Sequence, residues 1–147
     1  MSDNPLFDAS YRRLFGEGVG IDETAEPFFA SFYEIFLSDP EIAAFFSESN
    51  MPRQISMLRK SFFQLTAFYV SYRPSPELER LAKIHAGLGI GLQYYDRWLD
   101  ALIETVRRHD PESDEPTELA WRWAMTPGLT YMRLFGQPSD EEPENPP

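Results

Sequence analysis

Helical periodicity broken by proline and glycine is the feature that most constrains the fold of this chain. Apolar residues recur at intervals of three and four in two long segments. They are Ile55, Leu58, Phe62, Leu65 and Tyr69 in the first, and Leu99, Leu102, Ile103 and Val106 in the second. There is no long run of alternating apolar and polar residues, and no Asn-Gly or Asp-Gly hairpin turn. The pattern therefore predicts an all-α fold.

Helix-breaking residues divide the chain into seven or eight predicted helices with short connections. We expect helices over about 5–15, from 22 or 24 to 37, and over 40–46, 51–72, 77–87 or 77–89, 92–109 and 115–135. Asp22 or Thr24 offers an N-cap oxygen for the second helix, and Pro52 suits a first turn. Pro127 lies inside the last helix, where its missing N–H predicts a kink. Residues 1–135 are expected to form one domain.

Cysteine and histidine are scarce, which limits the chemistry of the chain. The 147 residues include no cysteine and two histidines. The absence of cysteine excludes a disulfide scaffold, thiolate zinc and iron–sulfur sites and a cysteine nucleophile, and it suits a cytoplasmic location. Two histidines leave little room for a multi-histidine metal site. Histidine chemistry must therefore involve His85 or His109.

The formal net charge of -11 limits the partners of the chain. Such an acidic protein is expected to repel nucleic acids and anionic membranes. The first ten residues show no secretory signal, and no stretch reaches 18 apolar residues, so we expect no membrane span. Four of the acidic residues belong to GQPSDEEPENPP, residues 136–147, which we predict to be a disordered tail.

Three polar residues fall on apolar faces of different predicted helices. His85 shares its face with Leu81, one turn before it, and a lone histidine in that position is commonly a core residue. Gln54 and Tyr33 lie on apolar faces of two other helices. Because buried polar groups need partners, the three together predict a polar guest or a water in an aromatic interior.

Four segments, in this order and spacing, resemble the globins. FYEIFLSDPEIAAFF is similar to the second globin helix and the corner after it, and NMPRQISMLRKSFF to the start of the distal helix. LERLAKIHAGLGI is similar to the proximal helix and its exit. YYDRWLDALIETVRRHDPE with ELAWRWAMTPGLTYM resembles the last two helices of bacterial single-domain and sensor globins. The resemblance covers about residues 20–135.

The resemblance implies a haem b pocket and a role for eight residues. It makes His85 the proximal iron ligand, with Leu81 packed under the porphyrin and Ile90 at its edge. It makes Tyr33 and Gln54 the hydrogen-bond donors of the distal side. The apolar residues that it places in the pocket are Leu58, Phe62 and the corner residue Phe46, with Phe45 as the alternative corner residue. Because Gln is a poor iron ligand, the sixth coordination position is expected to be open.

Such a globin is expected to bind O₂ reversibly, and also CO and NO, in O₂ handling, gas sensing or NO detoxification. An NO dioxygenase or peroxidase-like activity would need electrons from a separate reductase, and a sensor would need a separate signalling partner. The alternative is a haem-free globin-fold module that acts by interaction. The small residues Ala86 and Gly87 beside His85 favour a vacant cofactor site over that alternative.

Further residues have two interpretations each. Arg53, Lys60 and Lys83 are candidates to pair with haem propionates, and a solvated surface explains each of them as well. His109 stands among charged residues at a helix end and is expected at the surface. The three tryptophans, Trp98, Trp121 and Trp123, are expected to be core or half-buried.

Overall fold

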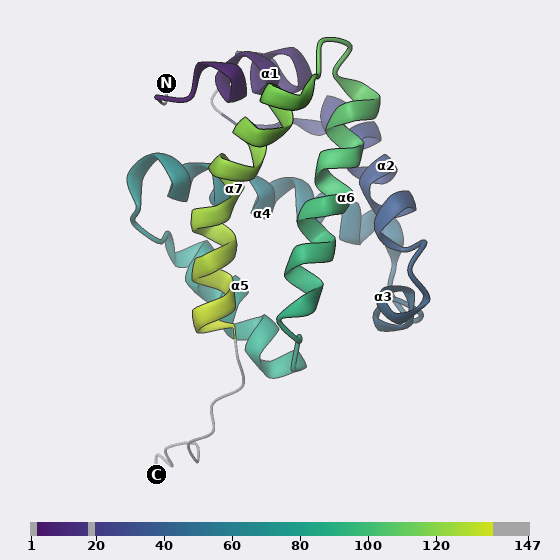
Figure 1. Cartoon of the computed structure of the whole chain (residues 1–147). Coiled ribbons are helices and arrows are strands. Elements are labelled where there is room, and N and C mark those ends of the chain that lie inside the picture. The colour runs from purple at the N-terminus through teal and green to yellow at the C-terminus, as the bar shows by residue number, and fades with distance from the viewer. Residues whose placement is uncertain (1–2, 18–19, 137–147) are drawn as a thin grey trace.

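The computed structural model describes residues 3–17 and 20–136, in which the regular structure is helical and no strand is present (Figure 1). The helices are α1 (Pro5–Phe15), the 3₁₀ turn η1 (Glu23–Ala25), α2 (Glu26–Phe36), α3 (Pro40–Phe45), α4 (Met51–Ser71), α5 (Pro76–Leu88), α6 (Gln93–His109) and α7 (Glu115–Phe135). The predicted all-α fold is confirmed. The predicted tail lies outside the described residues except for Gly136, which is buried.

Side-chain caps and prolines explain where the helices begin. The capping side chains that accept a hydrogen bond from a first-turn amide are Asn4, Asp39, Asn50, Ser75 and Asp114. Among the described α-helices, all except α6 have a proline in the first or second position, where a missing N–H costs nothing. Asp22 caps η1, so the predicted second helix opens as a 3₁₀ turn before α2.

The helices pack in crossed pairs rather than as a parallel bundle. In Figure 1, α6 and α7 run side by side in opposite directions, and α4 crosses behind them. The packed pairs are α4 with α7, α2 with α6, α6 with α7, α1 with α7, α2 with α4, α5 with α7 and α4 with α5. No described helix has the length and apolar character needed to cross a membrane.

The crossing of α4 and α7 is close because α7 carries a glycine there. A Cβ added to Gly128 would lie 2.7 Å from Cδ2 of Leu65, which is too close for a real contact. Gly128 follows Pro127, and α7 continues through both residues as one helix. The absence of a side chain at Gly128 therefore sets how closely the two helices approach.

Tryptophan burial is mixed. Trp121 is fully buried in the core and Trp98 is half-buried against it, as expected. Trp123 is 55% exposed on α7, so the expectation of a core or half-buried position is wrong for this residue. Its ring still packs against Tyr69 of α4, at 6.1 Å between ring centroids.

A network of buried hydrogen bonds links α1 to the connection between α6 and α7. Asp110 accepts hydrogen bonds from Ser10 Oγ at 2.6 Å and from Arg13 Nε at 2.7 Å. The indole N–H of Trp121 in turn donates to Ser10 Oγ at 2.9 Å. Burial alone would raise the pKa of the Asp110 carboxyl, but hydrogen bonds from Arg13, Ser10 and the Glu112 amide outweigh it and lower that pKa.

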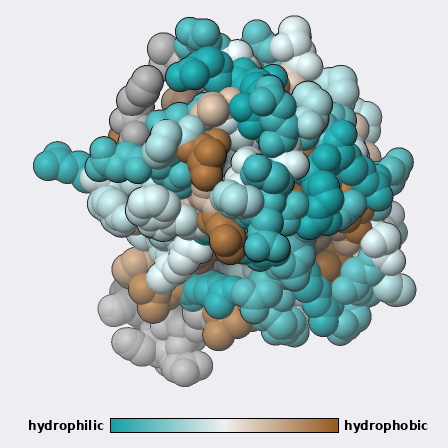
Figure 2. All heavy atoms as spheres, turned by 45° about the horizontal axis from the view of Figure 1, so that its top comes forward, coloured by the Kyte–Doolittle hydropathy of each residue, from teal (hydrophilic) through white to brown (hydrophobic). Residues whose placement is uncertain are grey.

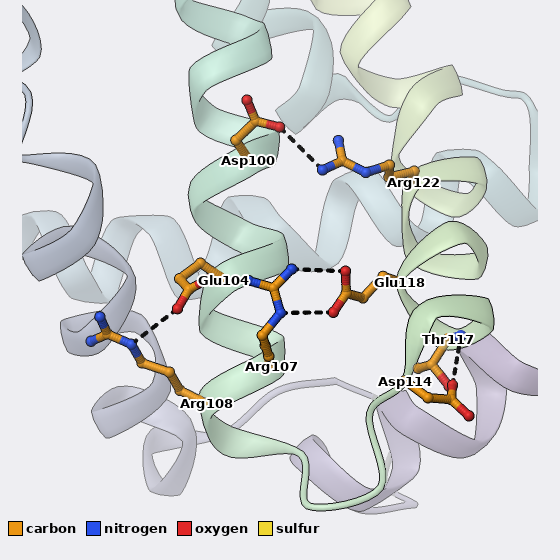
Figure 3. Close-up of polar contacts among 8 residues, drawn as sticks. All are labelled: Asp100, Glu104, Arg107, Arg108, Asp114, Thr117, Glu118 and Arg122. Atoms are coloured by element: carbon orange, nitrogen blue, oxygen red, sulfur yellow. Dashed lines mark hydrogen bonds and ion pairs between the residues drawn. The ribbon is translucent and has the colours of Figure 1, made fainter.

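Several ion pairs lie on the exposed side of the α6–α7 pair (Figure 3). Arg107 holds Glu118 through two hydrogen bonds of 2.8 Å. Arg122 of α7 lies 3.1 Å from Asp100 of α6. Figure 2 shows a largely hydrophilic face with separate apolar residues. The cations of this part of the surface are thus already neutralised by neighbouring carboxylates.

Candidate functional site

His85 lies at the end of α5, just before a tight turn. Helix α5 ends at Leu88, and Gly89 adopts the left-handed conformation with a φ of 68°. The Ile90 amide then donates to the His85 carbonyl at 3.4 Å. Glycine suits this position because it has no Cβ to clash. The turn therefore fixes the last turn of the helix, which carries the imidazole.

The imidazole of His85 has one nitrogen engaged and one free. Nδ1 lies 2.9 Å from the Leu81 carbonyl oxygen. Burial lowers the pKa of His85, so the ring is neutral at pH 7 and Nδ1 carries the proton that it donates to Leu81. Among the described residues, nothing forms a hydrogen bond with Nε2. The free lone pair on Nε2 is available to a metal, and a backbone acceptor on the other nitrogen is typical of metal-binding histidines.

Tyr33 supplies a buried phenol with an unused hydroxyl. Its side chain is buried in α2, and its ring packs against Phe32 at 5.4 Å and Phe46 at 5.7 Å between centroids. Burial raises the pKa of Tyr33 to about 12, so the hydroxyl keeps its proton at pH 7. No hydrogen-bond acceptor for it is found among residues 3–17 and 20–136. The hydroxyl is therefore a donor without a protein partner there.

Gln54 and Leu58 lie one turn apart on α4, and both are half-buried. The backbone amide of Gln54 donates to Asn50 at 3.0 Å, whereas its side-chain amide has no hydrogen bond to the described part of the chain. Helix α4 packs against both α2, which carries Tyr33, and α5, which carries His85. The helix that carries Gln54 and Leu58 therefore contacts both the helix of Tyr33 and the helix of His85.

The two candidate corner residues separate clearly. Phe46 is half-buried, and its ring packs against Tyr33 and against Phe36, at 6.4 Å from the latter. Phe45 is 48% exposed and packs against Tyr94 at 5.2 Å. Phe46 is therefore the corner residue that faces the interior.

Phe62 and Ile90 differ in burial. Phe62 is completely buried and packs against the rings of Phe29, Trp98 and Trp121, at 5.3, 6.4 and 6.2 Å. Ile90 is half-buried directly after the α5 turn. The contact of either residue with a cofactor stays a prediction.

Two features of the site go beyond what the sequence indicated. The sequence suggested a packing role for Leu81, whereas its carbonyl also orients His85, and the spacing of four residues on one helix was the available signal. The ring of Tyr95 lies 6.3 Å from that of His85 and is tilted against it. The buried Tyr95 hydroxyl has no hydrogen-bond partner among the described residues.

The family pattern of the bacterial-like globins matches residues 14–126, which include all eight predicted pocket residues. The chain belongs to the bacterial-like globin family. This globin is also similar to the crystal structure of a protein from Pseudomonas aeruginosa PAO1 described as structurally highly homologous to a human hemoglobin. The two are 29% identical with a TM-score of 0.76, over 91% of this chain and 98% of the other. A comparison with curated proteins gives no match.

The residues of this globin fit a haem. Among the described residues, His85 Nε2 and the Tyr33 hydroxyl have no hydrogen-bond partner, so the first would be available to an iron and the second to a polar guest. The apolar residues half-buried against the core offer contact area for a flat apolar group. Those on α4 to α6 and their connections are Met51, Ile55, Leu58, Phe63, Phe68, Leu81, Ile90, Tyr94, Trp98 and Leu99.

Proposed function

We propose that this globin binds haem b through His85 and takes up O₂, and also CO and NO, on the side of Tyr33 and Gln54. The observation that carries the proposal is the neutral His85 ring, held by the Leu81 carbonyl with Nε2 free. When bound, haem supplies a ferrous iron with one open position for a diatomic ligand.

On the proximal side, the chain holds the imidazole in one orientation. Donation from Nδ1 to the Leu81 carbonyl at 2.9 Å fixes the tautomer and keeps Nε2 unprotonated. Leu81 and Ile90 would pack against the lower face and edge of the cofactor. The ring of Tyr95 lies beside the imidazole, with the two centroids 6.3 Å apart.

On the distal side, the chain offers two hydrogen-bond donors in an apolar setting. The Tyr33 hydroxyl and the Gln54 side-chain N–H can each donate to a diatomic ligand that carries partial negative charge. Each such hydrogen bond contributes about 1 kcal/mol net. Phe46 and Leu58 would exclude water and so slow oxidation of the iron.

Haem reconstitution tests the proposal. The purified chain is mixed with haem, reduced, and its absorption spectrum is recorded before and after addition of CO. We expect a Soret band that shifts with CO. The His85→Gly variant should lose the proximal ligand, and added imidazole should restore the spectrum. The matched control is His109→Gly, which removes the other histidine, at an exposed position.

Two outcomes would contradict the proposal. A folded chain without a Soret band would favour the haem-free globin module, which acts by interaction alone. A Soret band that His85→Gly leaves unchanged would remove His85 from its role. NO consumption by the oxygenated protein with a reductant present would extend gas binding to an NO dioxygenase activity.

A further inference from the structure

The charge of this globin is unevenly distributed along the chain. The whole chain has a net charge of -11, yet residues 51–88, which contain α4 and α5, have six basic and two acidic residues. This segment therefore carries +4 and the remainder -15. The positive segment is the one that holds His85 and Gln54.

The cations of this segment also differ from the others in having no partner. Five exposed cations form no ion pair with a described residue, and we call them the basic α4–α5 surface. They are Arg53, Lys60, Arg73, Arg80 and Lys83. By contrast, the eight other basic residues all lie in ion pairs, as Arg107 and Arg122 do on α6 and α7 (Figure 3). Both lysines of the chain belong to the unpaired set.

Exposed apolar side chains lie between these cations. Met57 of α4 is 47% exposed, and Ile84 and Leu88 of α5 are 52% and 64% exposed. Met57 is spaced by four from Arg53 and by three from Lys60, and Ile84 by four from Arg80, so these apolar side chains share helix faces with the cations. Apolar residues within a charged rim are typical of a protein interface.

We propose that the basic α4–α5 surface docks an acidic electron-donor protein, with a flavin or iron–sulfur centre, which reduces the ferric haem of this globin. In this step the donor loses one electron and the ferric iron gains it to become ferrous, and no proton or group is transferred. The inference rests on the proposed haem binding. The -15 charge of the remaining chain would repel such a donor elsewhere, so the field orients it toward the helices that hold the cofactor.

An acidic protein suits this surface better than other polyanions do. Haem propionates would neutralise two positive charges at most, which leaves the segment positive. Nucleic acids extend beyond the patch and would meet the acidic remainder of the surface. A compact donor can place its carboxylates against the five cations alone, while its apolar contacts meet Met57, Ile84 and Leu88.

The decisive experiment measures the salt dependence of haem reduction. Ferric haem-loaded globin is mixed with reduced flavodoxin, an acidic flavin protein, under CO, and the Soret change is followed by stopped flow. Salt is varied from about 0.01 M to 1 M, over which the Debye length falls from about 30 to about 3 Å. Because both proteins are acidic, net charge alone predicts a rate that rises with salt. The proposal predicts a rate that falls.

Charge-reversal variants locate the effect. The double variant Lys60→Glu with Lys83→Glu should lower the low-salt rate on the order of tenfold. A control of identical net charge, Arg12→Glu with Arg122→Glu, changes α1 and α7 and should lower it much less. If the lysine variant retains no haem, Arg73→Glu with Arg80→Glu replaces it. In a separate ¹⁵N NMR titration of the CO form with oxidised flavodoxin, shifts should concentrate in residues 51–88.

Several results would overturn the docking proposal alone. They are a wild-type rate that rises with salt, equal losses in the α4–α5 and control variants, or NMR shifts elsewhere. Flotation with phosphatidylglycerol vesicles that depends on Lys60 and Lys83, together with a rate that rises with salt, would assign the surface to membranes instead. Absence of a Soret band before any donor is added would contradict the haem proposal, so the two failures are distinguishable.

Discussion

At the scale of single residues, the site combines a neutral imidazole with donors that have no partner among residues 3–17 and 20–136. The Leu81 carbonyl orients His85, and the ring of Tyr33 packs against Phe32 and Phe46. Buried donors without acceptors are costly unless a guest satisfies them. Under the proposed function, a diatomic ligand would accept hydrogen bonds from these donors.

Removal of the Tyr33 hydroxyl should speed O₂ release. Tyr33→Phe keeps the ring contacts with Phe32 and Phe46 and loses one hydrogen bond of about 1 kcal/mol, so the O₂ dissociation rate should rise about fivefold. Stopped-flow displacement of O₂ by CO measures it. Tyr72→Phe, at an exposed position, is the matched control. An equal change in the CO dissociation rate would indicate a rearranged pocket and contradict the hydrogen bond.

The sequence indicated which residue types would occupy the site but not every orientation. Family spacing distinguished Phe46 from Phe45 only by register, whereas the structure separates them by burial. Trp123 was predicted inside because tryptophans are usually buried, yet it lies on the outer side of α7. Side-chain direction depends on how helices are rotated against one another, and a periodic pattern defines that rotation only coarsely.

At the scale of the elements, helix boundaries were the most predictable feature. Asn50 with Pro52 and Ser75 with Pro76 define helix starts by local chemistry alone, and the structure begins α4 and α5 there. The 3₁₀ turn η1 was not foreseen, because Asp22 can cap either helix type. Contacts between distant elements, such as the Asp110 network, depend on tertiary packing and leave no local signal.

Loss of the Asp110 charge should destabilise the fold. Asp110→Asn weakens the bonds from Ser10 and Arg13 and leaves Arg13 without a carboxylate, which should cost about 2 kcal/mol of unfolding free energy. Urea unfolding measures it. Asp100→Asn removes an exposed carboxylate of α6 and should cost less than about 1 kcal/mol. Equal losses of unfolding free energy in the two variants would show that the buried network stabilises the fold no more than the exposed ion pair does.

Acid should remove the stabilisation that the Asp110 carboxylate contributes to the fold. The pKa of Asp110 is lower in the folded chain than in the unfolded one, so its stabilisation is present above about pH 4 and is lost as pH falls through the folded value. The difference in unfolding free energy between wild type and Asp110→Asn should therefore be constant from pH 7 to pH 5 and shrink below about pH 4. A difference that stays unchanged at pH 3 would contradict this assignment.

At the scale of the whole molecule, the described fold ends at Gly136, just before the acidic tail sequence. The amide of Gly136 donates to the Met132 carbonyl at 2.7 Å, and Gly136 is buried. The following residues contain four of the acidic side chains, so a chain that ends at Gly136 carries -7 in place of -11. We expect residues 1–136 to suffice for folding and for haem binding.

Truncation tests this expectation. A chain that ends at Gly136 should keep its helical circular dichroism, its Soret band with haem and its unfolding free energy to within about 0.5 kcal/mol. A chain that ends at Tyr131 also loses the buried Met132 and should be destabilised by about 2 kcal/mol or more. Loss of the Soret band in the chain that ends at Gly136 would show that residues 137–147 contribute to the cofactor site.

The bare backbone at Gly128 makes the packing of α7 depend on α4, the helix that carries two of the predicted pocket residues. Helix α4 carries Gln54 and Leu58 at one end and meets Gly128 of α7 through Leu65, farther along. A methyl group at position 128 would have to displace the Leu65 side chain. Under the proposed gas binding, a substitution at Gly128 would therefore act on α4 from outside the pocket, without any change in the chemistry that meets the gas.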